Sequence, residues 1–592
     1  ILSLAKQSSV LLSEERLTVF LDEAGPLLSR LGIQVVVPKE LHRELKPRLV
    51  LRDKKGATAS LVSYLDLASL VSYEWSIALG DRLLSVDEFE TLVAKKTPLV
   101  RFKDGFVRLD AEKIAELLKR ARSSKQITAV EVLKARFASE AHLSPELNQS
   151  IDALLQDGDY PPPAALQATL RPYQIRGYNW VCSLLMAGFG CILADDMGLG
   201  KTIQAIAVLL RLEESGLLGE GGALVVAPAA LLSNWERELE RFAPSLTVRR
   251  YHGNTRSITS KSRVLLTTYQ TAVRDGAKLA ARHFSLLIAD EAHIMKNAAT
   301  AASRTIKSLD VPYRLALSGT PVENRLEDLR SLFDFIIPGY LGSPETFKRE
   351  YRKPIEVDRD QERAERLRAI TAPFLLRRLK TDKAIISDLP DKITINEYAS
   401  LETEQAALYE SVVRDVLARS EQVTEKAERS ALILQLLTSL KQICDHPRCY
   451  DKESPPQSDL SGKAQLLMAL LEEILRGDEK VLIFSQYVET LEILKTIIQE
   501  ELEESVLLYH GGLGQTKRDQ VVQEFQTNPL SRIMLVSLKA GGLGLNLTAA
   551  SRVIHYDLWF NPAVENQATD RAFRIGQRSN VFVHRFITQN TF

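Results

Sequence analysis

The stretch Cys191-Ile-Leu-Ala-Asp-Asp-Met-Gly-Leu-Gly-Lys-Thr202 decides the fold of this chain. Its apolar start predicts a buried strand, and its glycines predict a tight loop that opens a helix. Backbone N–H groups in such a loop close around phosphates at the helix N-terminus. Lys201 would neutralise the β- and γ-phosphates of a nucleoside triphosphate, and the Thr202 hydroxyl would ligate Mg²⁺. Asp195 replaces the first glycine of the usual signature, and a Gly-rich turn without a ligand is the structural alternative.

An acidic pair downstream completes this half of a site. Asp290-Glu291-Ala-His293 follows the apolar run 286–289, and a buried strand would deliver both carboxylates to the end of a sheet. Asp290 would hold Mg²⁺, and Glu291 would position or deprotonate the attacking water. Acidic pairs are also common on solvated surfaces, but the position after a strand favours the functional interpretation. Gln174, which precedes the first strand, could bind the adenine edge through its paired donor and acceptor.

A distant segment supplies the second half of the predicted site. Gln567-Ala-Thr-Asp-Arg-Ala-Phe-Arg-Ile-Gly-Gln577 carries Arg571 and Arg574, two arginines spaced to reach the same phosphates from another domain. A site divided between domains couples hydrolysis to domain movement. We therefore expect a motor.

Short apolar runs alternate with amphipathic helical patterns in two parts of the chain. The runs are residues 191–194, 223–227, 264–267 and 286–289, and then 481–484, 506–509, 533–536 and 553–556. Continuous apolar strands of this length indicate parallel sheets that are covered on both faces. The predicted fold class is α/β with two parallel-sheet lobes. The part between the lobes, from about 322 to 460, is predicted to be mostly helical.

These patterns predict three domains. An α+β N-terminal accessory region covers residues 1–165 and ends in the stiff Pro161-Pro162-Pro163 linker. Within it, residues 99–109 predict a hairpin with Asp104-Gly105 in the turn, followed by a helix that Asp110 caps. The first lobe with its helical protrusion covers 166–388. The second lobe covers 389–592 and includes a protrusion at about 400–455.

Composition excludes several classes of protein. The 76 basic and 76 acidic residues give a formal net charge of zero, so a nucleic-acid partner must be held by a local basic groove. Four cysteines in 592 residues argue against a disulfide framework. Cys444, His446 and Cys449 lie close in sequence, but three ligands do not make a closed zinc site. No apolar run approaches the ~18 residues of a membrane span. The chain lacks an initiator Met, and we expect it to be a fragment of a longer protein.

The motifs together resemble the Swi/Snf-type ATPases of helicase superfamily two, over roughly residues 165–592. The resemblance rests on Leu170-Arg-Pro-Tyr-Gln174, residues 195–202 and 290–293, Leu317-Ser-Gly-Thr-Pro-Val-Glu-Asn324, residues 567–577, Pro228 with Asn234-Trp235, Phe374-Leu-Leu-Arg-Arg378, Ile443-Cys-Asp-His-Pro447, Phe484-Ser-Gln486, Tyr509-His-Gly-Gly512 and Lys539-Ala-Gly-Gly-Leu-Gly-Leu-Asn-Leu547. It implies two RecA-like lobes and ATP-driven translocation along double-stranded DNA, usually without strand separation.

The resemblance also implies residue roles. Arg571 and Arg574 would be arginine fingers, Gln567 would contact the nucleotide or the attacking water, and His293 with Ser318-Gly319-Thr320 would couple phosphate state to DNA grip. The nucleotide would also be bound by Asp196, Met197, Gly198, Leu199, Gly200 and Gly542. The segments that face DNA in the family hold Thr268, Asn324, Lys539, Asn546, Trp559 and Asn561.

The expected cofactors are ATP and Mg²⁺, and the expected partners are double-stranded DNA and a DNA-bound protein such as RNA polymerase or another nucleoprotein. We expect a monomeric motor that is cytoplasmic and nucleoid-associated in a prokaryote, the favoured origin, or nuclear in a eukaryote. The N-terminal region resembles accessory domains of bacterial members and could hold the lobes apart. The alternatives are a strand-separating DNA helicase, an RNA helicase, and a DNA-binding scaffold without hydrolysis.

Overall fold

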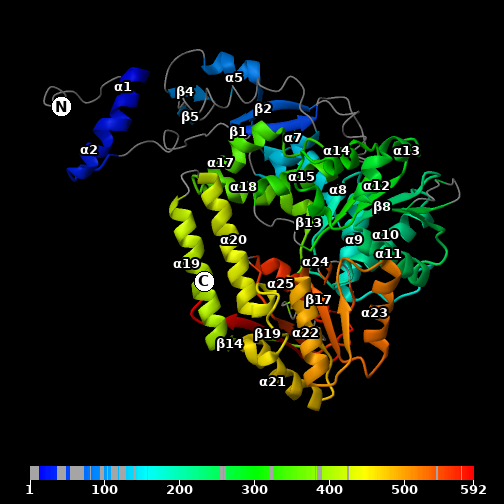
Figure 1. The fold of residues 1–592 in the computed structure, drawn as a ribbon. Coiled ribbons are helices and arrows are strands. Elements are labelled where there is room, and N and C mark those ends of the chain that lie inside the picture. Colours follow the sequence, from blue (N-terminus) through cyan, green and yellow to red (C-terminus); the bar gives the residue numbers. More distant parts are fainter. Residues whose placement is uncertain are drawn as a thin grey trace. The chain divides into compact units, whose positions relative to one another are not determined.

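The fold is taken from a computed structural model, drawn in Figure 1. It describes residues 12–35, 48–53, 73–79, 82–93, 99–102, 105–108, 118, 129–138, 142–143, 145–156, 158–253, 258, 262–319, 325–380, 382, 390–422, 426–541, 545–559, 561–574 and 576–591. Within these ranges, every helix is too short or too polar to cross a membrane.

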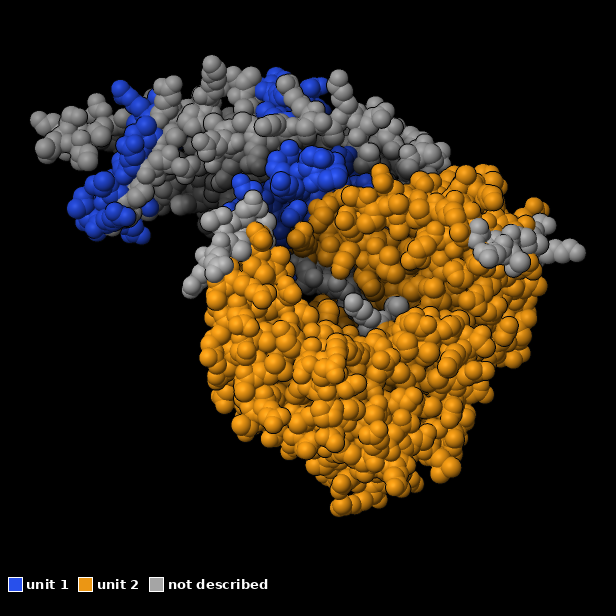
Figure 2. Space-filling view, viewed as in Figure 1, with its two compact units in different colours: residues 1–160, 179–191, 333–375 blue, residues 161–178, 192–332, 376–592 orange. Residues whose placement is uncertain are grey.

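The chain forms two compact units (Figure 2). Unit 1 comprises residues 1–160, 179–191 and 333–375, and unit 2 comprises 161–178, 192–332 and 376–592. Both predicted lobes have their sheets mainly in unit 2, whereas part of the helical segment after residue 332 belongs to unit 1 with the N-terminal region. The domain boundaries at 165 and 388 stay predictions.

Unit 1 contains a four-stranded sheet of order β3-β2-β1-β6 and a separate two-stranded hairpin. Its strands are β1 (Arg48–Asp53), β2 (Tyr73–Leu79), β3 (Arg82–Ser85), β4 (Leu99–Phe102), β5 (Gly105–Arg108) and β6 (His142–Leu143), and its N-terminal helices are α1 (Glu14–Val19), η1 (Phe20–Ala24), α2 (Gly25–Arg30), α5 (Val86–Val93), α7 (Ala129–Phe137) and α8 (Pro145–Leu155). The mixture of strands and helices confirms an N-terminal region with both elements.

The hairpin is present, but Gly105, which the sequence analysis placed in its turn, belongs to the second strand. Phe102 pairs with Gly105, so Gly105 begins the second strand. Asp104 and the helix predicted after Asp110 fall outside the described residues, apart from Leu118, which is helical.

Aromatic packing joins the N-terminal region to later parts of unit 1. The ring of Phe374 lies 6.2 Å from that of Phe137, 5.3 Å from that of Phe189 and 5.3 Å from that of Tyr340. The protrusion helices here are α15 (Leu326–Ile336), α16 (Pro344–Phe347), η3 (Lys348–Arg352), α17 (Lys353–Glu356), α18 (Gln361–Thr371) and η4 (Ala372–Phe374).

The first lobe is a seven-stranded sheet of order β13-β7-β12-β11-β8-β10-β9. Its strands are β7 (Cys191–Leu193), β8 (Ala223–Ala227), β9 (Val248–Tyr251), β10 (Val264–Thr268), β11 (Leu286–Ala289), β12 (Tyr313–Leu317) and β13 (Leu375–Leu376), and its helices are α9 (Pro172–Met186), α10 (Lys201–Glu214), α11 (Ala229–Phe242), α12 (Tyr269–Arg274), α13 (Gly276–Ala280), η2 (Ala292–Met295) and α14 (Ala301–Ser308). Strands β8, β10 and β11 are buried along their whole length and pair in parallel, as predicted.

The second lobe is a six-stranded parallel sheet of order β14-β19-β18-β15-β17-β16. Its strands are β14 (Lys392–Ala399), β15 (Val481–Ser485), β16 (Val506–Tyr509), β17 (Ile533–Ser537), β18 (Arg552–His555) and β19 (Val581–Thr588), and its helices are α19 (Thr403–Gln422), α20 (Lys426–Asp445), η5 (Pro447–Cys449), η6 (Ser458–Leu460), α21 (Gly462–Arg476), α22 (Val488–Glu501), α23 (Gln515–Thr527), α24 (Leu538–Gly541) and α25 (Pro562–Thr569).

The two faces of this second sheet explain why its strands are continuously apolar. Val481 and Ile483 of β15 pack into one core cluster with α21 and α22, whereas Leu482 and Phe484 pack into another with residues of α23 and α25. Successive side chains of a strand point to opposite faces, so a sheet covered on both sides needs apolar residues at every position. The predicted α/β class with two lobes is confirmed.

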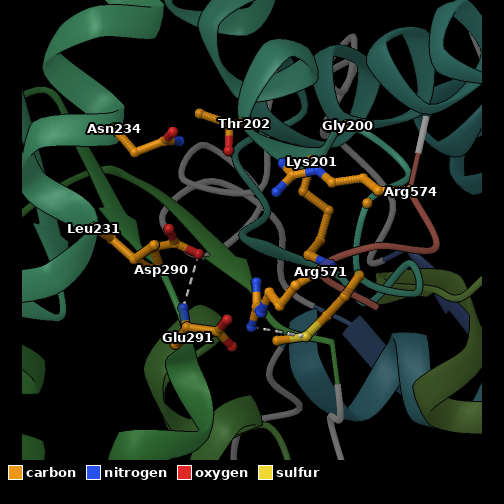
Figure 3. A pocket seen from close by; sticks show the side chains of 11 residues that line it. Gly200, Lys201, Thr202, Leu231, Asn234, Asp290, Glu291, Arg571 and Arg574 are labelled. Carbon is orange, nitrogen blue, oxygen red and sulfur yellow. Dashed lines mark hydrogen bonds between the residues drawn. The ribbon is translucent and has the colours of Figure 1, made fainter. Parts of the chain in front are cut away.

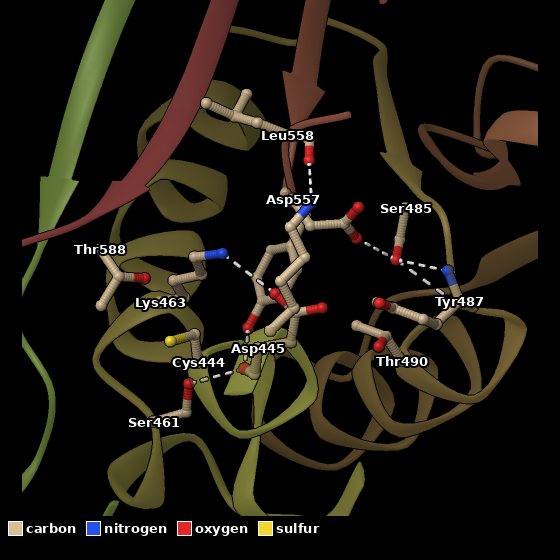
Figure 4. Close-up of polar contacts among 12 residues, drawn as sticks. Cys444, Asp445, Ser461, Lys463, Ser485, Tyr487, Thr490, Asp557, Leu558 and Thr588 are labelled. Atoms are coloured by element: carbon tan, nitrogen blue, oxygen red, sulfur yellow. Dashed lines mark hydrogen bonds and ion pairs between the residues drawn. The ribbon is translucent and has the colours of Figure 1, made fainter. Parts of the chain in front are cut away.

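A buried polar network ties helix α20 to the second sheet (Figure 4). Asp445, the last residue of α20, lies 3.0 Å from the ammonium of Lys463, and the Tyr556 hydroxyl donates to the Asp445 carbonyl at 2.7 Å. Lys441, one helical turn earlier, donates to the carbonyl of Leu558 at 2.7 Å. Burial raises the pKa of Asp445 to about 7, although Lys463 opposes this. The network therefore encloses the Asp445 carboxylate together with the Lys463 ammonium.

Asp557 is the second carboxylate of the network. It accepts hydrogen bonds from the Ser485 hydroxyl and from the backbone N–H of Gln486, the latter at 3.1 and 3.2 Å to its two oxygens. Its side chain is buried, and burial raises its pKa. The network thus fixes the chain just before Trp559 and Asn561.

Candidate active site

The phosphate loop joins β7 to α10 as predicted. Gly198 has φ +86° and Gly200 has φ +78°, conformations that side chains with a Cβ rarely adopt. Gly200 is the N-cap of α10, so the helix begins at Lys201. A Cβ on Gly200 would lie 2.4 Å from the amide nitrogen of Gln174, so the position also lacks space. Both glycines are required by backbone conformation and close packing.

A pocket opens over this loop and collects groups from both lobes (Figure 3). It is lined by Met197, Gly198, Gly200, Lys201, Thr202, Leu231, Asn234, Asp290, Glu291, Arg571 and Arg574. Five of the six predicted catalytic residues are in this set. The two carboxylates and Lys201 come from the first lobe, and the two arginines come from the segment after α25 in the second.

Lys201 is held by the loop that it follows. Its ammonium donates to the carbonyl of Asp195 at 2.6 Å and to that of Asp196 at 3.3 Å. Burial lowers the pKa of Lys201, while the nearby carboxylates of Glu291, Asp195 and Asp290 oppose that shift. The hydrogen-bond partners of the ammonium are neutral carbonyls, which leave its positive charge to pair with phosphate oxygens.

The structure explains why Asp195 replaces a glycine of the usual signature. Its side chain is fully buried, and the guanidinium of Arg378 binds both carboxylate oxygens, with Nε 2.8 Å from Oδ1. Gln204 on α10 lies 3.4 Å from Oδ2. Asp195 thus anchors the loop from below, a task that glycine cannot perform.

Gln174 contacts the loop as well. Its amide nitrogen donates to the carbonyl of Leu199 at 3.1 Å and to the Tyr173 hydroxyl at 3.3 Å, and its carbonyl accepts from the Arg171 N–H at 2.9 Å. Both the NH₂ group and the oxygen of the Gln174 side chain therefore bond to protein, whereas the sequence analysis expected them to bind adenine. Adenine recognition by Gln174 stays a prediction.

The acidic pair lies at the end of β11. One oxygen of Asp290 accepts from the Trp235 indole at 2.8 Å, and the other accepts from the Glu291 N–H at 2.9 Å. The Tyr269 hydroxyl donates to the Asp290 carbonyl at 2.8 Å. Burial, helped by the charge of Glu291, raises the pKa of Asp290 to about 6. The two hydrogen bonds therefore hold the carboxylate in one orientation at the end of the strand.

Glu291 has an unusual backbone. Its φ of +48° is in the left-handed region, which costs a non-glycine residue free energy and is typical of functional sites. Its carboxylate lies 3.3 Å from Nδ1 of His293. Burial alone would raise its pKa, but His293, Lys201 and Arg571 outweigh burial and lower it. Glu291 is therefore ionised and can orient or deprotonate a water.

The two arginines differ in their contacts. Arg571 is 3% exposed, and its guanidinium lies 3.5 Å from the sulfur of Met197 in the phosphate loop. Burial and the charge of Arg574 lower the pKa of Arg571 to about 10, so it stays protonated at neutral pH. A Cβ on Gly198 would lie 2.6 Å from Cγ of Arg574, so Arg574 packs directly on the loop. Both arginines are at the phosphate end of the site.

The residues present fit a magnesium–triphosphate. Asp290 and Thr202 offer the oxygen ligands that Mg²⁺ prefers, and they line the same pocket. Lys201, Arg571 and Arg574 would bring positive charge against the polyphosphate, and Glu291 would be left to act on the attacking water.

Other predicted site residues lie outside the set that lines this pocket. Asp196 accepts from the backbone N–H of Lys380 at 3.0 Å, and Leu199 is fully buried beneath the loop. Gln567 lies on α25, half-buried. Gly542 is outside the described residues. The nucleotide contacts of these residues stay predictions.

The predicted DNA-facing residues have mixed environments. Thr268 is buried and caps α12 through Thr271, and Asn561 caps α25 through the Ala563 N–H at 3.0 Å. Trp559 is half-buried against the second lobe's core, and Asn546 is exposed. Lys539 lies in α24, while Asn324 and Thr320 are outside the described residues. Their DNA contacts stay predictions.

Three residues of this region had no assigned role in the sequence reasoning. Trp235 orients Asp290, Arg378 holds Asp195, and Lys380 bonds both the loop and the arginine segment. Trp235 and Arg378 occur in motifs that carried the family resemblance, so that signal was available. For Lys380, the sequence offered no signal beyond its position two residues after Arg378.

Family models match three parts of this chain. The family described as SNF2-related domain matches residues 173–449, and the helicase conserved C-terminal domain matches residues 462–576. A family described as SNF2 Helicase protein matches residues 5–137, within the accessory region.

Individual proteins are also similar to this chain. YwqA of Bacillus subtilis, named as an ATP-dependent helicase/translocase, is 39% identical over 98% of this chain and 67% of its own length. The mouse chromodomain-helicase-DNA-binding protein 1-like is 35% identical over 71% of this chain and 48% of its length. The solved Sulfolobus solfataricus SWI2/SNF2 ATPase core in complex with dsDNA is 41% identical, covers 73% of this chain and 91% of that one, and has a TM-score of 0.41.

Proposed function

This chain belongs to the SNF2-related ATPases of helicase superfamily two, and on that premise we propose that it is a motor that tracks along double-stranded DNA and displaces or remodels proteins bound there. The observation that carries the proposal is the pocket lined jointly by Lys201, Asp290 and Glu291 of one lobe and by Arg571 and Arg574 of the other. Hydrolysis in such a pocket depends on how the lobes are placed, so each ATP cycle would move them.

Each side chain has a defined task in this proposal. Lys201 and the loop N–H groups bind the phosphates, and Glu291 orients or deprotonates the attacking water. Arg571 and Arg574 stabilise the charge that develops on the transferred phosphoryl group. Mg²⁺, held by Asp290 and Thr202, would supply further charge neutralisation.

DNA and its bound proteins are the proposed partners. The names of the relatives describe a helicase/translocase and a DNA-binding helicase, and a motor of this kind grips phosphates with little regard for sequence. With zero formal net charge, its binding should depend on a local basic groove and fall steeply with salt. In a prokaryotic cell such a motor would work on the nucleoid.

Steady-state ATPase of the purified chain tests the proposal. We expect duplex DNA to stimulate turnover more than single-stranded DNA or RNA does. Displacement of the third strand of a triplex, with the duplex left intact, would show movement along DNA. Release of single strands from a forked duplex would instead support the alternative, a strand-separating helicase, and preference for RNA would contradict the DNA proposal.

Two substitutions test the site itself. Lys201→Ala and Glu291→Gln should each lower turnover by at least about 10²–10³-fold, because each removes a group that acts on the transferred phosphate or on the attacking water. Thermal unfolding should change little, since Lys201→Ala only shortens a side chain that lines the pocket and Glu291→Gln keeps the shape of its side chain. Turnover retained in either folded variant would contradict the assignment.

A further inference from the structure

A short segment after the protrusion runs from the first sheet toward the pocket. We call residues 375–380 the strap. The carbonyl of Leu376 accepts from the Ala194 N–H at 2.7 Å, and the carbonyl of Arg378 accepts from the Asp196 N–H at 3.0 Å. The strap therefore follows β7 beyond its end and lies along the start of the phosphate loop.

Arg378 fixes the middle of the strap to the first lobe. Its guanidinium binds the buried carboxylate of Asp195, lies 2.9 Å from the side-chain oxygen of Gln204 and donates to the carbonyl of Tyr173. The arginine side chain is 8% exposed and the Asp195 side chain is fully buried. A bidentate pair in such a place holds a single geometry, so the strap and the loop move as one piece.

Lys380 extends from this anchored strap to the second lobe. Its ammonium lies 2.9 Å from Oδ1 of Asp570 and donates to the carbonyl of Phe573 at 2.6 Å. Its backbone N–H donates to Asp196 of the phosphate loop at 3.0 Å. The Lys380 side chain is only 4% exposed. One residue thus bonds the loop with its backbone and the other lobe with its side chain.

The two partners of the Lys380 ammonium have informative positions. Asp570 directly precedes Arg571, and Phe573 directly precedes Arg574. Holding a side chain and a carbonyl one residue before each arginine restricts the backbone that carries both. The side chain of Arg574 packs at the same place, because a Cβ on Gly198 would be 2.6 Å from its Cγ and 3.3 Å from the Lys380 ammonium.

We propose that Lys380 is a positioning residue that holds the arginine segment 570–574 in register with the phosphate loop during ATP hydrolysis. It acts through Arg571 and Arg574 and not by touching the nucleotide. The inference rests on the proposed function, because it concerns the placement of the arginines that this function requires. An ammonium buried with one carboxylate is costly for stability alone, and a role in placing catalytic groups gives a reason to retain it.

The decisive variant is Lys380→Met, which keeps most of the length of the side chain and removes the charge. At saturating duplex DNA we expect kcat to fall by roughly 10–100-fold, the loss typical when a residue that orients a catalytic group is removed. Nucleotide affinity, measured by binding of a fluorescent ATP analogue, should change less than about threefold, because an arginine finger acts mainly in the transition state. Weakened nucleotide affinity with unchanged kcat would overturn the proposal.

A matched control is available in the second lobe. Lys452 also pairs with a carboxylate, that of Glu489, but the two side chains are 59% and 42% exposed. Lys452→Met should leave kcat unchanged. Lys380→Arg, which keeps the charge and can still bond Asp570, should recover part of the lost rate; failure of Arg to recover any rate, with the protein folded, would count against positioning by charge.

A double-variant test separates positioning from a general structural effect. If Lys380 acts through the fingers, adding Lys380→Met to Arg574→Ala should lower the single-turnover rate by much less than it does in the wild-type background. Losses that simply multiply would overturn the proposal. If Lys380→Met does not fold, Asp570→Asn carries the same expectation, since Asp570 is the partially exposed partner.

The wild-type protein keeps the two proposals distinguishable. If it shows no DNA-stimulated ATPase, the proposed function fails first. If it turns over ATP normally and folded Lys380→Met matches it, only the positioning role is wrong.

Discussion

The two lobes each place a buried aspartate just beyond a buried strand, and the two aspartates have different surroundings. Asp290 follows β11 and faces a pocket with Lys201, Thr202 and two arginines. Asp557 follows β18 and is enclosed by the Ser485 hydroxyl and the Gln486 N–H, with Lys463 of the same network nearby. Burial raises the pKa of both.

Both oxygens of each carboxylate accept a hydrogen bond from the protein, so these bonds alone do not distinguish the two aspartates. The difference lies in what else surrounds the oxygens. Those of Asp557 are enclosed by the framework, whereas a carboxylate that lines a pocket can use its remaining lone pairs to bind a cation. Asp290 is held by Trp235 and by the Glu291 N–H, and it still lines the pocket.

The largest expected effect separates these two aspartates. Asp290→Asn should lower kcat by at least about 10³-fold, because it removes the proposed ligand of the Mg²⁺ that would neutralise the transferred phosphoryl group. Asp557→Asn should leave kcat at saturating DNA within severalfold and lower the melting temperature instead. Steady-state ATPase and thermal unfolding of both variants decide this. Equal losses of kcat in the two variants would contradict the different roles assigned to the two aspartates.

Arg574→Ala tests the pocket that Asp290 lines, through a residue that the second lobe contributes. We expect kcat to fall by about 10³-fold while ATP affinity is retained, because an arginine finger stabilises mainly the transition state. Single-turnover hydrolysis and equilibrium binding of an ATP analogue measure the two quantities. A loss of affinity with unchanged kcat would assign Arg574 to ground-state binding.

Lys463→Met tests the buried polar network that encloses Asp445 and Asp557. It leaves the buried carboxylate of Asp445 without its 3.0 Å partner, and removing one partner of a buried pair costs about 3–5 kcal/mol of stability. The urea midpoint of the second lobe should fall accordingly. Arg476→Met is the control, because its pair with Glu472 has side chains that are 81% and 54% exposed and should contribute under about 1 kcal/mol. Equal shifts for the two variants would contradict the enclosed network.

A smaller change in kcat is expected from the protonation of Lys380, a buried residue that we propose to position the arginine segment. Burial lowers the pKa of Lys380 from 10.5 to about 8; the charges of Asp570 and Asp196 oppose this, and that of Arg574 adds to it. As pH rises through about 8 the ammonium loses its proton, so kcat should fall toward the Lys380→Met rate, by roughly tenfold. Lys380→Arg stays charged and should not show this loss.

Stability should move in the opposite direction over the same range. Between about pH 8 and 10.5 the unfolded chain keeps the proton that folded Lys380 has lost. The folded state therefore gains stability from this group as pH rises. Rates and melting temperatures of wild type and Lys380→Arg from pH 7 to 9.5 test both signs, and a wild-type loss that Lys380→Arg shares would have another cause.

Much of the fold and the pocket could be predicted from local patterns. Continuous apolar runs predicted buried parallel strands, because a sheet covered on both faces leaves no polar position. Gly198 and Gly200 predicted a loop with positive φ. The prediction that Arg571 and Arg574 belong to the same site as the phosphate loop agrees with their place in the pocket, and their contact with phosphates stays a prediction. Gly105 was assigned to the hairpin turn but begins the second strand, because a glycine in a short extended segment does not by itself fix the register of pairing.

The groups expected to bind a triphosphate could be read from the sequence alone, because a phosphate loop, a strand-end acidic pair and paired arginines are each local patterns. Which charges line the pocket and which are enclosed follows instead from the packing of distant segments. It paired Asp195 with Arg378, Asp570 with Lys380 and Asp445 with Lys463. The partners of the first two pairs lie nearly two hundred residues apart. Whether a buried charge is anchored or available depends on such neighbours, and spacing along the chain does not specify them.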